Sequence, residues 1–248
     1  MKKILELKNV GLTYQTPKDE INAVKDLSFS VNEGEFVSII GPSGCGKTTV
    51  LSMIAGLITA TGGKIEFLAK NERKDCIGYM LQKDQLFPWR TIEKNILLPL
   101  EIKKSLTKER KEYADSLLKK YGLYEFKDNY PSELSGGMRQ RVALIRTLVF
   151  SPDILLLDEP FSAIDYQTRL SVCNDVYSII KAEHKTAILV THDISEAISM
   201  SDKIVVLTKR PAKVKSEFFP GLSGETPLKR RELPEFSLLF EKIWKELN

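Results

Sequence analysis

Cysteine is scarce in this sequence: 248 residues contain three, Cys45, Cys76 and Cys173. They form no CxxC pair, and neither of the two histidines stands at metal-ligand spacing, so neither a disulfide framework nor a zinc site is predicted. No apolar run approaches the ~18–20 residues that cross a bilayer. The opening MKKILELKNV reaches Glu6 and Lys8 before an apolar stretch develops, which argues against a secretory signal. We therefore expect a cytoplasmic chain.

A large excess of one charge is also missing. The 37 Lys and Arg residues stand against 33 Asp and Glu, a formal net charge of +4. A dedicated nucleic-acid binder is expected to carry a pronounced basic stripe, so no nucleic-acid partner is predicted. The remaining composition, 42% hydrophobic and 28% charged, is that of an ordinary globular protein with one large or two small domains.

The order of periodic segments predicts an α/β fold. The first third of the chain holds short β-type stretches: KILELKNVGLTY, INAVKDLSFSV, EFVSII, GKIEFLA and CIGYML. From 91 to about 150, apolar residues stand three and four apart, which predicts a helical insert. DILLLDEP and TAILVTHD, separated by a predicted helix over 166–183, are typical of parallel strands covered on both faces. We expect a right-handed doubly wound sheet with ligands at the carboxyl ends of its strands.

Residues 41–48, GPSGCGKT, match the phosphate-loop pattern GxxxxGK[ST] between a strand and a helix predicted over 48–57. Backbone N–H groups and the helix dipole would hold phosphates, Lys47 would neutralise β/γ charge, and the Thr48 hydroxyl would ligate Mg²⁺. The alternative is a glycine turn that binds nothing. The loop residues predicted to contact a nucleotide are Gly41, Pro42, Ser43, Gly44, Cys45, Gly46, Lys47, Thr48 and Thr49.

The strand ILLLDEP places two carboxylates next to each other. Adjacent residues at a strand end point in different directions. Asp158 can therefore join the Mg²⁺ coordination shell opposite Thr48, while Glu159 orients or deprotonates the attacking water. The alternative is a solvated acidic turn before Pro160.

The segment LSGGMRQR, residues 134–141, resembles the signature sequence of ABC ATPases. Ser135, Gly136 and Gly137 at a helix N-terminus would form a second anion site; the alternative is a helix cap formed by Ser135. The resemblance implies a P-loop NTPase (RecA-like) core, an N-terminal antiparallel β subdomain and a helical signature subdomain over about 84–150. It assigns 1–232 to an ABC ATPase domain, and 233–248 is predicted to be an amphipathic helix packed on that domain.

The same resemblance assigns further site residues. Gln82 corresponds to the Q-loop glutamine that contacts Mg²⁺ or water and reports nucleotide state to a membrane partner. His192 corresponds to the switch histidine on the γ-phosphate, Asp165 to the D-loop aspartate and Tyr14 to the aromatic stacked on adenine. The sequence departs from the usual D-loop at Ile164, where leucine is common.

Two phosphate sites in one chain suggest a head-to-tail homodimer. If Ser135 and Gly137 belong to the opposite subunit's nucleotide, ATP joins the phosphate loop of one copy to the signature helix of the other. Hydrolysis would then release the two copies. The chain has one set of motifs, so a closed assembly requires a second copy or a close paralogue.

Residues 86–92, LFPWRTI, resemble the nitrate/sulfonate/taurine branch of bacterial ABC importers, which includes subunits for thiamine-precursor uptake. The resemblance implies a membrane permease docking near 82–92, an extracytoplasmic substrate-binding protein, and a peripheral place on the cytoplasmic side of the membrane. A Pro88-Trp89 pair offers a rigid aromatic docking surface; alternatively, Trp89 caps the helical insert. A soluble ABC ATPase acting on ribosomes or DNA, and an exporter or lipid-extraction ATPase, remain competing functions.

Two further features have open interpretations. Cys45 lies at a helix N-terminus that could lower its thiol pKa, or it simply fills a tight loop. The basic run over 103–111 is predicted to be a solvated helix face, with contact to anionic lipid headgroups as the alternative.

Overall fold

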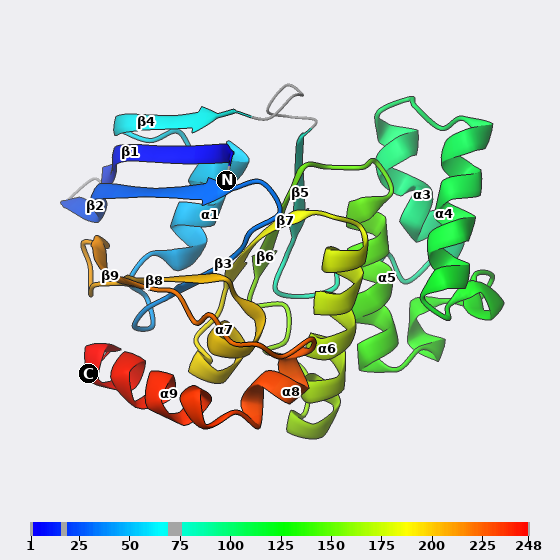
Figure 1. Cartoon of the computed structure of the whole chain (residues 1–248). Coiled ribbons are helices and arrows are strands. Elements are labelled where there is room, and N and C mark those ends of the chain that lie inside the picture. Colours follow the sequence, from blue (N-terminus) through cyan, green and yellow to red (C-terminus); the bar gives the residue numbers. More distant parts are fainter. Residues whose placement is uncertain (1, 16–18, 69–75, 248) are drawn as a thin grey trace.

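The computed structural model describes residues 2–15, 19–68 and 76–247 (Figure 1). Its N-terminal part is a three-stranded antiparallel sheet with the order β2-β1-β4. Over much of β1 and β2 the buried residues stand two apart, as expected for strands with one covered face. This sheet confirms the predicted antiparallel β subdomain. Its strands are β1 (Lys3–Gln15), β2 (Glu20–Asn32) and β4 (Gly62–Phe67).

The central sheet has six strands in the order β5-β6-β7-β3-β8-β9. The first five are parallel and β9 is antiparallel to β8. Every residue of β3, β6, β7 and β8 is buried, which is why four of the five residues in each of these strands are apolar. The strands are β3 (Phe36–Ile40), β5 (Ile77–Met80), β6 (Ile154–Asp158), β7 (Thr186–Val190), β8 (Lys203–Leu207) and β9 (Val214–Phe218).

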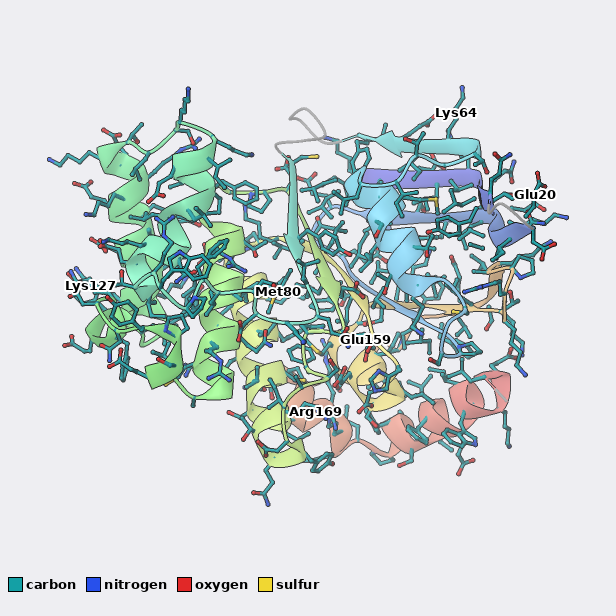
Figure 2. All side chains as sticks on the ribbon, turned by 180° about the vertical axis from the view of Figure 1, so that it is seen from behind. Glu20, Lys64, Met80, Lys127, Glu159 and Arg169 are labelled. Carbon is teal, nitrogen blue, oxygen red and sulfur yellow. The ribbon has the colours of Figure 1, made fainter. Side chains whose placement is uncertain are left out.

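Helices cover this sheet and form an arm at one side of it. Figure 1 shows α3, α4 and α5 beyond β5, on the side away from the three-stranded sheet, and Figure 2 shows the same arrangement from behind. The arm consists of α3 (Ile92–Ile102), α4 (Lys108–Lys120), η1 (Tyr124–Phe126), η2 (Pro131–Glu133) and α5 (Gly136–Leu148). The other helices are α1 (Lys47–Ala55), α6 (Tyr166–Ala182), α7 (Ile194–Met200), α8 (Pro227–Arg231) and α9 (Pro234–Leu247).

The basic run over 103–111 does not form one helix face, so that prediction was wrong. Helix α3 ends at Ile102 and α4 begins at Lys108, with a turn between them. The Thr107 side chain caps α4 by accepting a hydrogen bond from the Arg110 N–H at 3.3 Å. A good N-cap starts a new helix at this point, and the positive charges therefore belong to a turn and the first part of α4.

Helix α9 packs against the rest of the chain through its apolar stripe. Phe236 and Ile243 are buried in a cluster with Ile194 and Ile198 of α7 and Val206 of β8. Among the described residues, the structure contains no helix that is both long enough and apolar enough to span a membrane.

Candidate functional site

The phosphate loop joins the buried strand β3 to α1 at the carboxyl end of the sheet. A cavity of about 200 Å³ opens on the loop. Glu159, one of the residues that line this cavity, is labelled near the middle of the molecule in Figure 2. The cavity is lined by Ser43, Gly44, Gly46, Lys47, Thr48, Thr49, Glu159 and Arg210.

Glycines give this loop its shape. Gly44 and Gly46 have φ angles of 70° and 120°, which L side chains rarely adopt. A Cβ at Gly46 would also lie 3.3 Å from the Ala23 carbonyl oxygen. The buried Lys47 Nζ donates to the carbonyls of Gly41 at 2.9 Å and Pro42 at 3.2 Å. The loop therefore holds its lysine over an opening lined by backbone groups, an arrangement suited to anions.

Asp158 ends β6 beside the start of α1. Its Oδ1 accepts a hydrogen bond from the Thr48 hydroxyl at 3.1 Å, and its Oδ2 accepts one from the Tyr79 hydroxyl at 3.3 Å. Burial raises the pKa of Asp158, and these two hydrogen bonds oppose that shift. Burial, with the charge of Asp158, raises the pKa of Tyr79 to about 12, which keeps its hydroxyl a donor.

Thr48 and Asp158 are suited to a small hard cation. Among the described residues, no three His, Cys, Asp or Glu side chains gather into a metal-binding group. Mg²⁺ does not need one, because it commonly takes one or two protein oxygens and completes its shell with phosphate and water. The adjacent hydroxyl and carboxylate fit that pattern.

Glu159 and His192 face each other at the ends of β6 and β7. The His192 Nδ1 and Glu159 Oε2 atoms lie 3.1 Å apart. Glu159 has a φ of 45°, and its N–H donates to the Val190 carbonyl at 2.9 Å. This left-handed backbone turns the Glu159 side chain away from Asp158, so the two adjacent carboxylates can act on different groups.

Gln82 follows the end of β5, and Asp165 lies on the segment that follows Glu159. The Gln82 Nε2 donates to the Ser162 hydroxyl at 3.3 Å, and the Ser162 hydroxyl donates to the Glu159 carbonyl at 3.0 Å. Asp165 caps α6 by accepting the Thr168 N–H at 3.1 Å, and backbone donors lower the pKa of Asp165. Two hydrogen bonds, through the Ser162 hydroxyl, therefore connect Gln82 to the backbone of Glu159.

The signature segment lies in the helical arm and does not line the phosphate-loop cavity of its own chain. Ser135 caps α5 by accepting the Met138 N–H at 3.3 Å. A Cβ at Gly137 would lie 2.8 Å from Val172 Cγ2 on α6, whereas Gly136 has only the end of the Arg139 side chain within 4 Å. Gly137 therefore packs α5 against α6, and Gly136 keeps the helix N-terminus open.

Sequence reasoning missed Tyr79 and Arg210. Tyr79 lies in β5, paired with β6, and Arg210 donates to the Gly44 carbonyl at 2.9 Å from the segment after β8. Both reach the site from segments to which the sequence had assigned no role in nucleotide binding. Tyr14, predicted to stack on adenine, lies in β1 with 39% of its surface exposed and is not part of the cavity lining.

Cys45 is buried in the phosphate loop, and burial raises its thiol pKa, opposed by Lys47. We therefore expect Cys45 to react with iodoacetamide at pH 7.5 at least about tenfold more slowly in the folded protein than in urea. Peptide mass spectrometry over time measures this rate. Cys173, whose pKa is also raised by burial, is the internal control. Rapid labelling of Cys45 alone would contradict the inert interpretation.

Comparison with known proteins gives the family. Residues 24–162 match the family described as "ABC transporter". The chain belongs to the ABC transporter family. It is 50% identical to the uncharacterized ABC transporter ATP-binding protein YtlC of Bacillus subtilis, over 98% of this chain and 95% of that one. This ABC cassette is also 34% identical to the taurine import ATP-binding protein TauB of Roseobacter denitrificans, over 96% of this chain and 92% of the relative.

A solved structure supports the fold and the reaction. The dimeric post-hydrolysis state of the cassette MJ0796, bound to ADP and Pi, superposes with a TM-score of 0.73 at 34% identity, covering 88% of this chain and 99% of that one. The P-loop NTPase fold with a helical arm is thereby confirmed. The chain is an ABC-type ATP hydrolase.

Proposed function

We propose that this ATPase powers a bacterial importer of a small solute, of the taurine, sulfonate, nitrate or thiamine-precursor type, from the cytoplasmic face of the membrane. The observation that carries the catalytic part is the placement of Thr48–Asp158 and Glu159–His192 around one phosphate-loop cavity. The relationship to a taurine import subunit over 96% of this chain supports the import direction. Import would also require a permease and an extracytoplasmic binding protein.

Within this proposal, each carboxylate has a separate task. Lys47 neutralises the β/γ-phosphates, and Thr48 with Asp158 holds Mg²⁺, assisted by Gln82. The cation supplies charge neutralisation on the phosphates. Glu159 orients the attacking water and accepts its proton, and His192 contacts the γ-phosphate from the next strand.

The remaining nucleotide contacts come from two chains. The backbone and side chains of residues 41–49 surround the phosphates, and Tyr14 stacks on adenine from β1. Ser135, Gly136 and Gly137 lie outside their own chain's cavity, so they are assigned to the nucleotide of a second copy, with Asp165 at the same interface. A head-to-tail dimer closed by ATP follows from this arrangement. The dimeric structure of the related cassette supports it.

The surface after Gln82 is suited to a permease. Trp89 is 71% exposed, and its ring lies 5.1 Å from that of Phe87, between centroids. The fully buried Asn95 holds this turn by accepting the Phe87 N–H at 2.7 Å and donating to the Phe87 and Arg90 carbonyls. Thr91 caps α3, so Trp89 does not cap the helix and its ring is left on the surface. A rigid exposed aromatic pair is a strong candidate for a docking site.

A membrane pull-down tests the importer proposal. Tagged Glu159→Gln protein with MgATP is expected to recover a multi-helix permease from detergent-solubilised native membranes, identified by mass spectrometry. Adding Trp89→Ala should reduce that recovery at least about tenfold, because interface aromatics of this kind contribute 2 kcal/mol or more. The other tryptophan, Trp244 on α9, provides the matched control: Trp244→Ala should keep the permease. Recovery of ribosomes or DNA would instead indicate a soluble ABC ATPase.

A further inference from the structure

Glu196 is a buried carboxylic acid that the proposed reaction does not use. Helix α7 follows the segment Thr191–Asp193, which we call the histidine turn. Glu196 lies in the first turn of α7 with 3% of its surface exposed. Such a group is expensive to bury as a charge unless other groups hold it. The structure shows that Glu196 is held by this turn.

A chain of hydrogen bonds connects Glu196 to both neighbours of His192. The Asp193 N–H donates to the Thr191 hydroxyl at 3.0 Å, and that hydroxyl donates to Glu196 Oε2 at 2.6 Å. Asp193 Oδ1 in turn accepts the Glu196 N–H at 3.2 Å. Since both residues that flank His192 are in this chain, the carboxylate of Glu196 restricts the backbone that carries the imidazole.

Charged groups of the turn and one charged group from outside it act on this acid. The charge of Asp193 raises the pKa of Glu196, whereas Arg169 and His192 lower it. Arg169, labelled in Figure 2, comes from α6 and lies 3.9 Å from Asp193 Oδ2. Helix α6 also carries Cys173, and α8 carries Arg231. Burial and the charge of Glu196 raise the pKa of the Cys173 thiol, and the charge of Arg231 lowers it. Strand β3 and helix α9 contribute apolar residues to the cluster around α7: Ile40, Phe236 and Ile243.

We propose that Glu196 is a positioning residue for His192: its carboxylate, through Thr191 and Asp193, holds the histidine turn in the conformation that hydrolysis requires. This inference rests on the proposed role of His192 at the γ-phosphate. An ionised Glu196 can only accept from Thr191, so the direction of every hydrogen bond in the chain is fixed. A protonated Glu196 can donate to Thr191 instead, which leaves the threonine proton without its acceptor.

The ionisation of Glu196 gives the proposal a pH readout. Burial, the largest cause, raises the pKa of Glu196 from 4.5 to about 7. The carboxylate is then mostly ionised at pH 8 and mostly protonated at pH 6, so kcat for ATP is expected to fall about tenfold between these two values. KM for ATP should change little, because Lys47 and the phosphate loop lie outside this hydrogen-bonded chain.

Glu196→Gln removes the titration while keeping an oxygen that can accept from Thr191. Because a neutral acceptor is weaker than a carboxylate, kcat should fall about threefold at pH 8, and the decline from pH 8 to pH 6 should disappear. Thr191→Val keeps the shape and breaks the chain, and kcat should fall about tenfold at pH 8 with KM for ATP maintained. An unchanged pH profile in Glu196→Gln would overturn the proposal.

Stability provides a readout that does not depend on activity. Between pH 4.5 and 7 the unfolded chain has released the Glu196 proton and the folded chain retains it, so the contribution of Glu196 to stability is full below pH 4.5 and is lost as pH rises through 7. Glu196→Gln should therefore raise Tm relative to the parent protein more at pH 8 than at pH 5.5. An equal effect at both values would contradict the assigned ionisation.

A third variant separates this inference from the proposed function. His192→Ala should lose most ATP hydrolysis at every pH. If that variant remains active, the assignment of His192 fails and the positioning proposal fails with it. If His192→Ala is inactive while Glu196→Gln keeps the parental pH profile, only the role of Glu196 is wrong.

Discussion

Glu159→Gln is expected to lower ATP hydrolysis by about 10²–10⁴-fold while ATP binding persists. The amide has nearly the shape of the carboxylate, so its contact with His192 across 3.1 Å can be kept. The glutamine amide, unlike the carboxylate, cannot accept a proton from the attacking water. Thr48, Asp158 and Lys47 are unchanged, and the variant should therefore bind MgATP but not hydrolyse it.

The trapped nucleotide should hold two copies together. Phosphate release measures the rate, and light scattering on a sizing column, with and without MgATP, measures the dimer. Glu235→Gln in the first turn of α9 makes the same chemical change away from the cavity and should behave like the parent protein. Rapid turnover by Glu159→Gln, or a monomer at saturating MgATP, would contradict the role given to Glu159.

Local patterns predicted the parts of the fold that depend on neighbouring residues. The runs that became β6 and β7 were identified because strands buried along their whole length are built mainly from apolar residues, four of the five in each case. The strand order was not predictable in the same way. Strand β3 lies between β7 and β8, which follow it by at least about 150 residues in the chain, and this pairing depends on the packing of the whole sheet. The break at 103–107 depended on one capping threonine.

The same distinction separates the site residues. The phosphate loop and the Asp158–Glu159 pair are contiguous in sequence, so their spacing alone indicated phosphate chemistry. Tyr79 and Arg210 act through partners on other segments, which their own sequence surroundings do not reveal. Glu196 acts through Thr191 and Asp193 nearby in the chain, but its burial depends on the packing around α7. The backbone of Glu159, at a φ of 45°, is likewise set by its hydrogen bond to Val190 on the neighbouring strand.

Two inactive variants are expected to restore activity when mixed. Lys47→Ala removes the cation of the phosphate loop and should lower hydrolysis at least about a hundredfold. Ser135→Arg places a long side chain at the exposed start of α5 and should block the second anion site. Losing the Ser135 cap costs about 1 kcal/mol of stability, which a folded cassette tolerates. Melting curves of each variant check that both remain folded.

In a head-to-tail dimer, one mixed pair contains one site with both lesions and one site with neither. Random pairing at equal concentrations makes about half of the dimers mixed, so about a quarter of all sites are intact. Phosphate release from the mixture should therefore rise toward a quarter of the parental rate if sites act independently. If Ser135 served the nucleotide of its own chain, every site in the mixture would carry one lesion and the mixture would stay inactive. The mixing experiment thus decides which chain supplies the signature segment.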